Sequence, residues 1–249
     1  MEYHVSKTTE ELGVAAAETA GAIIRNAIEE RGRANIVLAT GMSQVNTLSN
    51  LVERDDIDWQ AVTAFHLDEY IGLSESHAAS FRKYLKERFL AHVPHLGEFH
   101  FVDGEAADPQ QECRRVGNII SQHRIDVALV GIGENAHLAF NDPPADFDVS
   151  DPFIVVELDQ ACRQQQVNEG WFDSLDDVPS RAISMTISQI MRSENIVASV
   201  PDKRKAEGVK CSVEGAVSKM CPASILQQHL SCELFLDNAS ASLLGQTGK

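Results

Sequence analysis

VALVGIGENAHLAFNDPP, residues 127–144, is the stretch that sets the fold class and marks where function is expected. An apolar run, residues 127–130, passes directly into Gly131 and Gly133 and then into polar residues. Apolar runs without polar alternation are typical of strands that are buried on both faces. A chain that leaves such a strand on glycines can turn tightly and approach a ligand. The stretch therefore predicts a buried strand followed by a functional loop.

Similar runs recur along the chain and define the expected architecture. The expected strands are 36–39, 62–67, 99–102, 127–130, 154–158, 182–187, 196–200 and 234–236. Amphipathic segments of helical length lie between most of them, at 8–31, 43–53, 77–91, 109–123, 203–214 and 222–229. Strands that alternate with helices predict an α/β fold in three layers, with a mostly parallel, Rossmann-like sheet and helices on both faces. We expect a single domain, residues 1–249.

Composition and charge limit the classes of function. Hydrophobic residues make up 43% of the chain and charged residues 23%, which is ordinary for a globular domain. The net charge of −16 argues against nucleic acid and anionic membranes as partners, because both need a contiguous basic surface. The sequence lacks the pattern of a signal peptide and of a membrane span. The five cysteines form no CxxC pair, so we expect reduced thiols and a cytoplasmic location.

The first polar strand end is LATGMSQVNTL, where the run 36–39 passes into Thr40, Gly41, Met42 and Ser43. Backbone N–H groups of such a turn, the two hydroxyls and the positive end of the following helix can bind a phosphate. A serine N-cap beside a permissive glycine explains the same residues without a ligand. Both interpretations stay open at this point.

The second strand end is FHLDEY, in which a buried strand ends in two adjacent acids, Asp68 and Glu69. Successive strand residues point to opposite faces, so we expect the two acids on different sides. A carboxylate in a partly desolvated cleft has a raised pKa and is a better base for removing a proton from carbon. A pair of solvated turn acids is the alternative.

The third is the loop of the opening stretch, where Asn135, His137 and Asp142 follow Gly133. A histidine that is oriented by an amide or an acid can transfer protons near neutral pH, although a lone loop histidine is often structural. The sequence GIGENA lacks the third glycine of the dinucleotide-binding motif, which argues against a nicotinamide cofactor.

The fourth is VPDKRKAEGVK, where Asp202 can cap a helix whose first turn carries three cations, the last of them Lys205. Cations in a first turn oppose the helix dipole, and an anion bound near Lys205 would compensate. A solvated basic turn is the alternative. If the four strand ends meet at the carboxyl edge of one sheet, they form a site for a phosphorylated metabolite.

Together these motifs resemble the glucosamine-6-phosphate deaminase/isomerase family, within a wider group that includes the 6-phosphogluconolactonases. The resemblance covers nearly the whole chain and rests on TGMS, HLDEYIGL, GIGENAHLAFNDPP, DDVPSRAISMT, RKAEGVK and CPASILQQH, in the family's order and spacing. The motifs LDEY and HLAFNDP are typical of the deaminase branch.

The resemblance implies a role for each matching residue. Asp68 would move a proton from C2 to C1 through an enediol, and His137, with Asn135 and Asp142 beside it, would open the pyranose ring. Loss of the C2 amine would then convert glucosamine 6-phosphate to fructose 6-phosphate and ammonia. No metal or organic cofactor is implied. The candidate substrate-binding residues are Thr40, Gly41, Met42, Ser43, Glu69, Gly133 and Lys205.

Three features depart from the family's pattern. The usual Asp-Gly-His reads Asn135-Ala136-His137, and an amide can orient the ring but cannot favour its charged form as a carboxylate does. The usual Glu before the proline is Asp142. The family's lid arginine, which clamps phosphate, has no match in QVNEGWFDS, part of the irregular segment 167–180 that is a candidate lid. The residues that could replace it are Gln165, Gln166 and Arg163.

Two other functions remain as alternatives, a lactonase in which His137 activates water and a sugar-phosphate-binding regulator without turnover. The presence of both Asp68 and His137 favours the deaminase, because a pure binder has little use for a base beside the sugar. The expected partner is a small-molecule sugar phosphate. The acidic stretch ADFDVSDPF lacks the basic residues of the effector site in hexameric relatives. The expected assembly is therefore open between a monomer and a small homo-oligomer.

Overall fold

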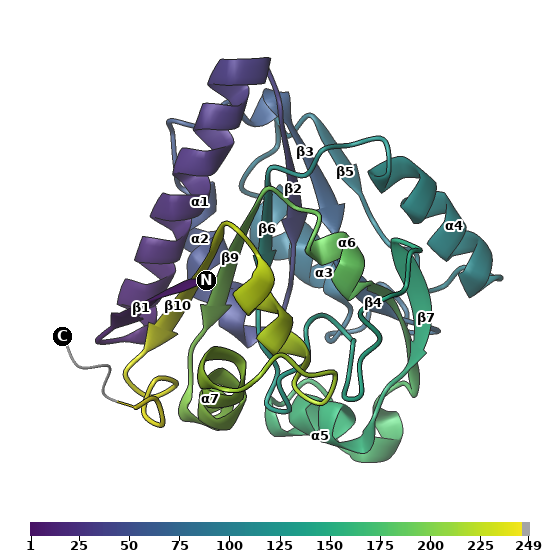
Figure 1. Cartoon of the computed structure of the whole chain (residues 1–249). Helices are drawn as coiled ribbons and strands as arrows, with labels where there is room; N and C mark the ends of the chain where they lie inside the picture. The colour runs from purple at the N-terminus through teal and green to yellow at the C-terminus, as the bar shows by residue number, and fades with distance from the viewer. Residues whose placement is uncertain (246–249) are drawn as a thin grey trace.

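A parallel sheet forms the centre of the computed structural model, which describes residues 1–245 (Figure 1). Its seven strands lie in the order β1-β10-β9-β6-β2-β3-β5, and all neighbours are parallel. They are β1 (Glu2–Ser6), β2 (Ala34–Leu38), β3 (Val62–His66), β5 (Glu98–His100), β6 (Val127–Val130), β9 (Asn195–Val200) and β10 (Cys232–Asp237). The predicted α/β class is confirmed. Residues 246–249 of the expected domain lie outside the described residues.

Helices cover both faces of this sheet, as expected. They are α1 (Thr9–Arg31), α2 (Val45–Val52), α3 (Phe81–Leu85) with the π-helical turn η3 (Lys86–Leu90), α4 (Pro109–Ile120), α5 (Gln160–Asn168), α6 (Ile187–Ile190) and α7 (Ala206–Glu214). Short 3-10 turns are η1 (Met42–Gln44), η2 (Trp59–Ala61), η4 (Leu175–Asp177), η5 (Lys203–Lys205) and η6 (Pro222–Gln228). In β6, Val127 and Leu129 pack in the core under α1 and α2. Ala128 and Val130 pack in the core under α4, α7 and η6.

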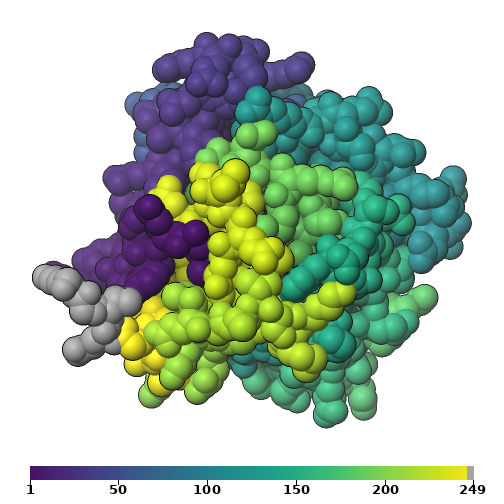
Figure 2. All heavy atoms as spheres, viewed as in Figure 1, coloured from purple at the N-terminus to yellow at the C-terminus, as the bar shows by residue number. Residues whose placement is uncertain are grey.

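The N-terminal segment shows how local signals set the element bounds. The side chain of Thr8 accepts a hydrogen bond from Glu11 N at 3.2 Å, so α1 begins at the next residue. Gly32 ends it in the left-handed conformation (φ 73°). Before α1, β1 pairs with β10, and the space-filling view shows the purple N-terminus against the yellow C-terminal part of the chain (Figure 2). Neither α1 nor any other helix in residues 1–245 is long and apolar enough to cross a membrane.

A second, antiparallel sheet departs from the expected arrangement. It contains β4 (Asp68–Tyr70), β8 (Arg181–Met185) and β7 (Phe153–Glu157), in the order β4-β8-β7. The runs 154–158 and 182–187 read as buried strands of the main sheet, but α5 and η4 return the chain so that the two runs pair with each other. The predicted strand 62–67 ends one residue early, because β3 stops at His66. Leu67 lies between β3 and β4, so Asp68 begins the second sheet.

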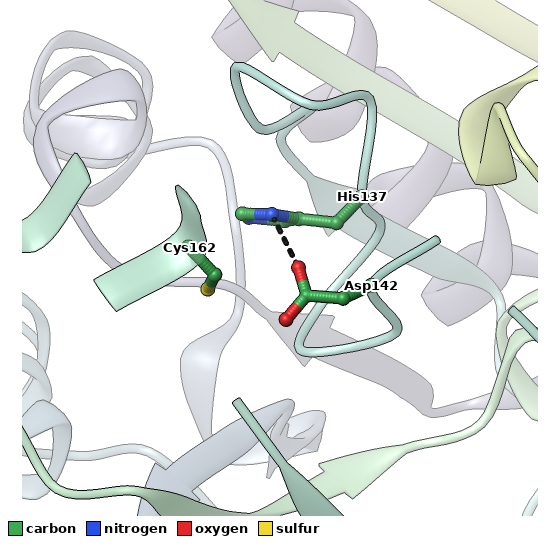
Figure 3. Close-up of side chains that lie close together, drawn as sticks. All are labelled: His137, Asp142 and Cys162. Carbon is green, nitrogen blue, oxygen red and sulfur yellow. Dashed lines mark ion pairs between the residues drawn. The ribbon is translucent and has the colours of Figure 1, made fainter. Parts of the chain in front are cut away.

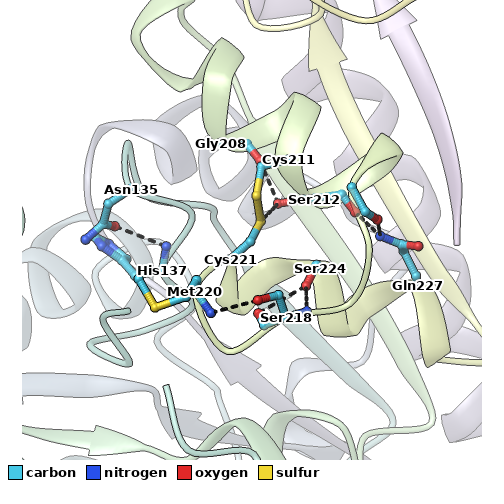
Figure 4. The surroundings of a disulfide bond; sticks show 11 residues. Asn135, His137, Gly208, Cys211, Ser212, Ser218, Met220, Cys221, Ser224 and Gln227 are labelled. Atoms are coloured by element: carbon cyan, nitrogen blue, oxygen red, sulfur yellow. Dashed lines mark hydrogen bonds between the residues drawn. A yellow bond between two sulfur atoms is a disulfide. The ribbon is translucent and has the colours of Figure 1, made fainter. Parts of the chain in front are cut away.

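The expectation that all cysteines are reduced thiols is wrong for one pair. Cys211, on α7, and Cys221, just before η6, form a disulfide with an S–S distance of 2.05 Å (Figure 4). Sequence spacing does not reveal this pair, because it is the packing of α7 against η6 that brings the two residues together. The other cysteines are buried and free, namely Cys113, Cys162 and Cys232.

Candidate active site

The four polar strand ends meet around one cavity at the carboxyl edge of the main sheet. They follow β9, β6, β2 and β3, which are consecutive neighbours in the sheet. Parallel neighbours place their following loops at the same edge, where open α/β sheets bind ligands. The cavity is lined by Ala39, Thr40, Gly41, Met42, Ser43, Leu67, Asp68, Phe81, Gly131, Ile132, Gly133, His137, Ala139, Phe140, Gln165, Gln166, Glu169 and Lys205.

The loop after β2 brings the main chain to the cavity wall. Gly41 has a φ of 87°, a left-handed conformation that favours glycine, and η1 begins at the next residue. No side chain caps η1 or α2, so the interpretation of Ser43 as an N-cap is wrong. Gly131 lets this loop approach closely, because a Cβ there would lie 2.8 Å from Ser43 Oγ. The main-chain N–H groups at the start of η1 can therefore donate hydrogen bonds to an anion.

Asp68 places its carboxyl group in the cavity wall at the start of β4. Its backbone is held by pairing with Ser184 of β8, and the residue is 6% exposed. Burial, together with the charge of Glu69, raises the pKa of Asp68 to about 8. A carboxylate with so high a pKa is a much stronger base than an exposed one, which is what proton removal from carbon requires.

Glu69 lies on the other side of β4, as the strand alternation predicts, and does not line the cavity. Its carboxylate accepts hydrogen bonds of 2.8–3.3 Å from one hydroxyl and three main-chain N–H groups, donated by Ser80, Tyr70, Phe81 and Arg82. The guanidinium Nε of Arg82 also lies 3.4 Å from Glu69 Oε2. The geometry therefore gives Glu69 a structural role, anchoring α3 to β4, in place of the expected contact with substrate.

His137 lines the same cavity from a tight turn after β6. A hydrogen bond from Gly133 N to His137 O, 3.0 Å long, closes the turn. Residue 133 must be glycine, because a Cβ there would lie 2.3–2.4 Å from the Cε1, Nδ1 and Nε2 atoms of the imidazole. Ala136 has a φ of 65°, in the left-handed region that suits the family's usual glycine better than alanine. The turn thus fixes the ring through its backbone.

Asn135 organises the acids behind this histidine. Its Oδ1 accepts from the main-chain N–H of His137 at 3.2 Å. Its Nδ2 donates to Asp142 Oδ1 at 3.0 Å and to Asp159 Oδ2 at 3.3 Å. An aspartate at position 135 would set a third carboxylate against these two. Asparagine, which departs from the family's pattern at position 135, therefore suits this chain because its amide donates to both neighbouring carboxylates.

Asp142 and Cys162 complete the surroundings of the imidazole (Figure 3). Nδ1 of His137 lies 3.2 Å from Asp142 Oδ1, close enough for an ion pair but not aligned for a hydrogen bond. Burial alone would raise the pKa of Asp142, but His137 and the Asn135 amide outweigh it and hold the pKa below its usual value. A carboxylate in this place can orient the ring and stabilise its protonated form.

The same three side chains form the one group in residues 1–245 with atoms placed to hold a metal ion. The ligand atoms of His137, Asp142 and Cys162 all lie within 4.8 Å of one another. Burial, and next the charge of Asp142, raise the pKa of the Cys162 thiol well above its usual range. A metal needs the thiolate, so this environment works against metal binding.

Lys205 supplies a cation to the cavity wall, and Glu169 faces it. Asp202 accepts a hydrogen bond from Arg204 N at 2.9 Å, which confirms the predicted cap of the turn that carries Lys205. The side chains of Lys205 and Glu169 are each 6% exposed, with 3.5 Å between Nζ and Oε1. Burial lowers the pKa of Lys205, and the Glu169 carboxylate opposes that shift. Sequence reasoning missed Glu169, although an acid beside Gly170 and Trp171 in the candidate lid was a signal.

Helix α5 brings two of the three candidate replacements for the lid arginine to the cavity. Gln165 and Gln166 line it, and each is 7% exposed. Arg163 does not reach the cavity and instead braces the irregular segment, donating to the carbonyl oxygens of Leu175 and Val178. Within residues 1–245 no arginine lines the cavity.

The chain is similar to known proteins over most of its length. The family described as glucosamine-6-phosphate isomerases/6-phosphogluconolactonase matches residues 7–234. A glucosamine-6-phosphate deaminase of Exiguobacterium sibiricum is 38% identical over 214 residues, which cover 86% of this chain and 82% of the relative. A glucosamine-6-phosphate deaminase of Bacillus thuringiensis is 32% identical over 242 residues, which cover 97% of this chain and 88% of the relative.

Solved structures are similar over the same span. A monomeric glucosamine-6-phosphate deaminase, described as a missing link of the NagB superfamily, has a TM-score of 0.88 at 33% identity and covers 98% of this chain and 100% of its own. A 6-phosphogluconolactonase from Trypanosoma brucei has a TM-score of 0.79 at 18% identity, covers 98% of each chain and shares the fold. The expected resemblance is thereby confirmed, and the chain belongs to the family of glucosamine-6-phosphate isomerases and 6-phosphogluconolactonases.

Proposed function

We propose that this protein is an amino-sugar-phosphate deaminase/isomerase that converts glucosamine 6-phosphate and water to fructose 6-phosphate and ammonia. The observation that carries the proposal is that Asp68, His137 and Lys205 line one cavity. A buried base, an imidazole and a cation are the groups that this reaction needs on a phosphorylated amino sugar. The deaminases that are 32–38% identical over most of the chain support the same substrate.

Lys205 and the loop at residues 40–43 bind the phosphate in this proposal. The loop offers main-chain N–H groups at the start of η1, and the Lys205 ammonium lies in the same wall. An N–H cluster and a buried cation together favour a phosphate over a neutral group. We call residues 40–43, Lys205 and Glu169 the phosphate side of the cavity.

Asp68 and His137 carry out the proton transfers, and we call them, with Asn135 and Asp142, the proton-transfer side. His137 moves a proton between the ring oxygen and the anomeric hydroxyl, which opens the pyranose to the aldehyde. Asp68 then removes the C2 proton, giving an enediol-type intermediate that bears the amine at C2. Return of the proton to C1 leaves an imine at C2, which water hydrolyses to the ketone and ammonia. These steps balance as proton transfers and a hydrolysis, without oxidation or reduction.

The test is release of ammonia from glucosamine 6-phosphate, with fructose 6-phosphate measured in the same samples. In D2O the isomerisation is expected to place solvent deuterium at C1. Asp68→Asn keeps the shape of the residue but removes the base, so we expect turnover to fall by about 1000-fold. Glucitol 6-phosphate, which has no carbonyl, should still stabilise this variant against heat.

Glu29→Gln is the matched control, because it removes one exposed carboxylate from α1. It should leave turnover unchanged. Equal activity of Asp68→Asn and the parent would overturn the assignment of the base. Hydrolysis of a 6-phosphogluconolactone without ammonia release would favour the lactonase, and binding of hexosamine phosphates without any turnover would favour the regulator.

We further propose that the protein acts in the cytoplasm. Phosphorylated sugars are charged and do not cross membranes unaided, so their enzymes work in the compartment where they are formed. For the assembly, the monomeric state of the deaminase that is 33% identical supports a single chain. Sedimentation at several protein concentrations would distinguish a monomer from a small homo-oligomer.

A further inference from the structure

Glu169 is a charged residue of the cavity that the proposed reaction does not use. Its Oε1 accepts a hydrogen bond from Gln165 Nε2 at 2.8 Å and lies 3.5 Å from Lys205 Nζ. Gln165 is itself held, because its Oε1 accepts from Glu134 N at 3.0 Å. Both contacts of Glu169 use Oε1, which leaves Oε2 to accept a hydrogen bond from a ligand. The phosphate side of the cavity therefore contains a buried hydrogen-bond acceptor whose position is fixed, Oε2 of Glu169.

This carboxylate changes the charge that a ligand meets. Lys205 supplies one positive charge, and Glu169 cancels it. Arg204 does not restore the balance, because its side chain is 40% exposed and paired with Asp202 at 2.7 Å. The other titratable groups around Glu169 and Lys205 are Glu134, Asp68, His137, Tyr70 and Cys162. Helix α5 contributes the neutral amides of Gln165 and Gln166 to the cavity instead of a second cation. The two negative charges of a dianionic ligand would therefore face too little positive charge.

We propose that Glu169 makes the cavity selective for the protonated, singly charged form of a phosphate monoester. A phosphate dianion has only acceptor oxygens, which a carboxylate repels. The monoanion keeps one P–OH group that donates a hydrogen bond to Glu169, while its other oxygens accept from Lys205 and the loop at 40–43. The second pKa of phosphate monoesters is about 6, so both forms exist near neutral pH. Sulfate, which has no such proton, is rejected.

The inference rests on the proposed function, because it takes the cavity to be the sugar-phosphate site. It is tested by calorimetric titration of the full chain with methyl phosphate, whose dianion has no P–OH group, and with inorganic sulfate from pH 5.5 to 8.5. We expect phosphate binding to weaken by about tenfold as pH rises, and sulfate to bind about tenfold more weakly than phosphate at the acid end. In Glu169→Gln, sulfate should bind about tenfold more tightly and the pH dependence of phosphate binding should fall to about threefold or less.

Two further variants keep the result interpretable. Asp173→Asn removes an exposed acid from the same segment and should behave as the parent chain. Glu169→Asp retains the carboxylate, so it should keep the preference for phosphate even if Glu169→Gln does not fold. The inference is overturned if Glu169→Gln and the parent show the same preference and pH profile, or if Glu169→Asp loses the preference. Failure of the parent to bind either anion would instead remove the proposed phosphate site, whereas a parent that binds both anions equally well overturns this inference and leaves the proposed site in place.

Discussion

The two sides of the cavity are built by different means. On the proton-transfer side, Asp68 is fixed by strand pairing, and His137 lies on a turn in which glycine at 133 leaves room for the imidazole. On the phosphate side, Lys205 lies on a short turn and meets Glu169 just beyond the end of α5, where the family's lid arginine is missing. The difference indicates that proton transfer needs geometry set by the backbone. In the proposed function, anion binding relies instead on side chains that a peripheral helix brings to the cavity.

Among the variants that test this contrast, the largest effect should come from adding a single methyl group on the proton-transfer side. Gly133→Ala forces the imidazole out of position, because the new Cβ would meet three ring atoms at 2.3–2.4 Å. A displaced catalytic group loses about 100-fold or more in rate, so we expect kcat to fall by that factor while circular dichroism shows an intact fold. Steady-state kinetics of ammonia release measures it.

Gly131→Ala is the matched variant on the phosphate side. The one close contact of its Cβ would be the hydroxyl of Ser43, at 2.8 Å, and that side chain can rotate, while Gln44 Nε2 and Ser199 O lie at ordinary distances of 3.4 and 3.7 Å. We expect KM to rise by a few-fold, about 1 kcal/mol or less, with kcat little changed. Similar losses of kcat in both variants would break the contrast between the two sides.

An intermediate effect should follow from restoring the family's acid beside the histidine. Asn135→Asp replaces a donor that now contacts Asp142 and Asp159 at 3.0 and 3.3 Å with a third carboxylate. Loss of these bonds and like-charge repulsion should cost about 1–3 kcal/mol of stability and about tenfold in kcat. Urea unfolding and kinetics at pH 7.5 measure both quantities.

A second substitution, at Asp159, tests whether the neighbouring acids cause the losses of stability and kcat in Asn135→Asp. Asp159→Asn in the Asn135→Asp background removes one of them and should recover part of both losses, since asparagine can still cap α5. A variant Asn135→Asp that is more active than the parent would show that the amide is not matched to its surroundings.

The smallest effect is a stability change at Asp68. Its folded pKa of about 8 lies above the value of about 4 expected when unfolded, so the folded state holds a proton that the unfolded state releases. Its contribution to stability is therefore full below about pH 4 and is lost as pH rises towards 8. Asparagine does not ionise, so Asp68→Asn does not lose this stability as pH rises. The Tm of the variant minus the Tm of the parent should therefore increase by about 3 °C or more between pH 5 and 8.

Calorimetry at both pH values checks that trend, with Glu29→Gln as the reference. An advantage that is constant with pH would contradict the raised pKa of the base. The same pKa predicts that kcat in the parent rises with pH until about 8, because the base must be ionised to accept the C2 proton.

Sequence predicted six of the seven strands of the main sheet, because strands buried on both faces leave continuous apolar runs and the helices between them carry clear periodicity. It missed the edge strand β1, which is largely exposed and has no such run. It missed the second sheet, because β7 and β8 are equally apolar and their pairing with each other depends on where α5 returns the chain. The disulfide was missed for a similar reason, since it is the packing of α7 against the next element, η6, that joins Cys211 and Cys221.

The cavity residues could be predicted where a motif concentrates unusual residues at a strand end, as it does at Asp68 and His137. Their catalytic roles stay predictions until they are tested. Strand alternation predicted that Glu69 lies on the opposite side from Asp68, but its structural role depends on its partners at the start of α3, which the sequence does not reveal. The position of Glu169 beside Gly170 and Trp171 was a signal, but its burial against Lys205 is set by tertiary packing and could not be predicted from the sequence.

The consecutive order of β9, β6, β2 and β3 in the sheet has a consequence for how such a site can change. Each strand delivers its own loop to the cavity, so the four segments reach the site from separate points of the scaffold. Substrate preference can therefore drift by exchange of one segment at a time while the scaffold and the remaining segments stay in place. A set of related activities on one framework is the natural outcome of that independence.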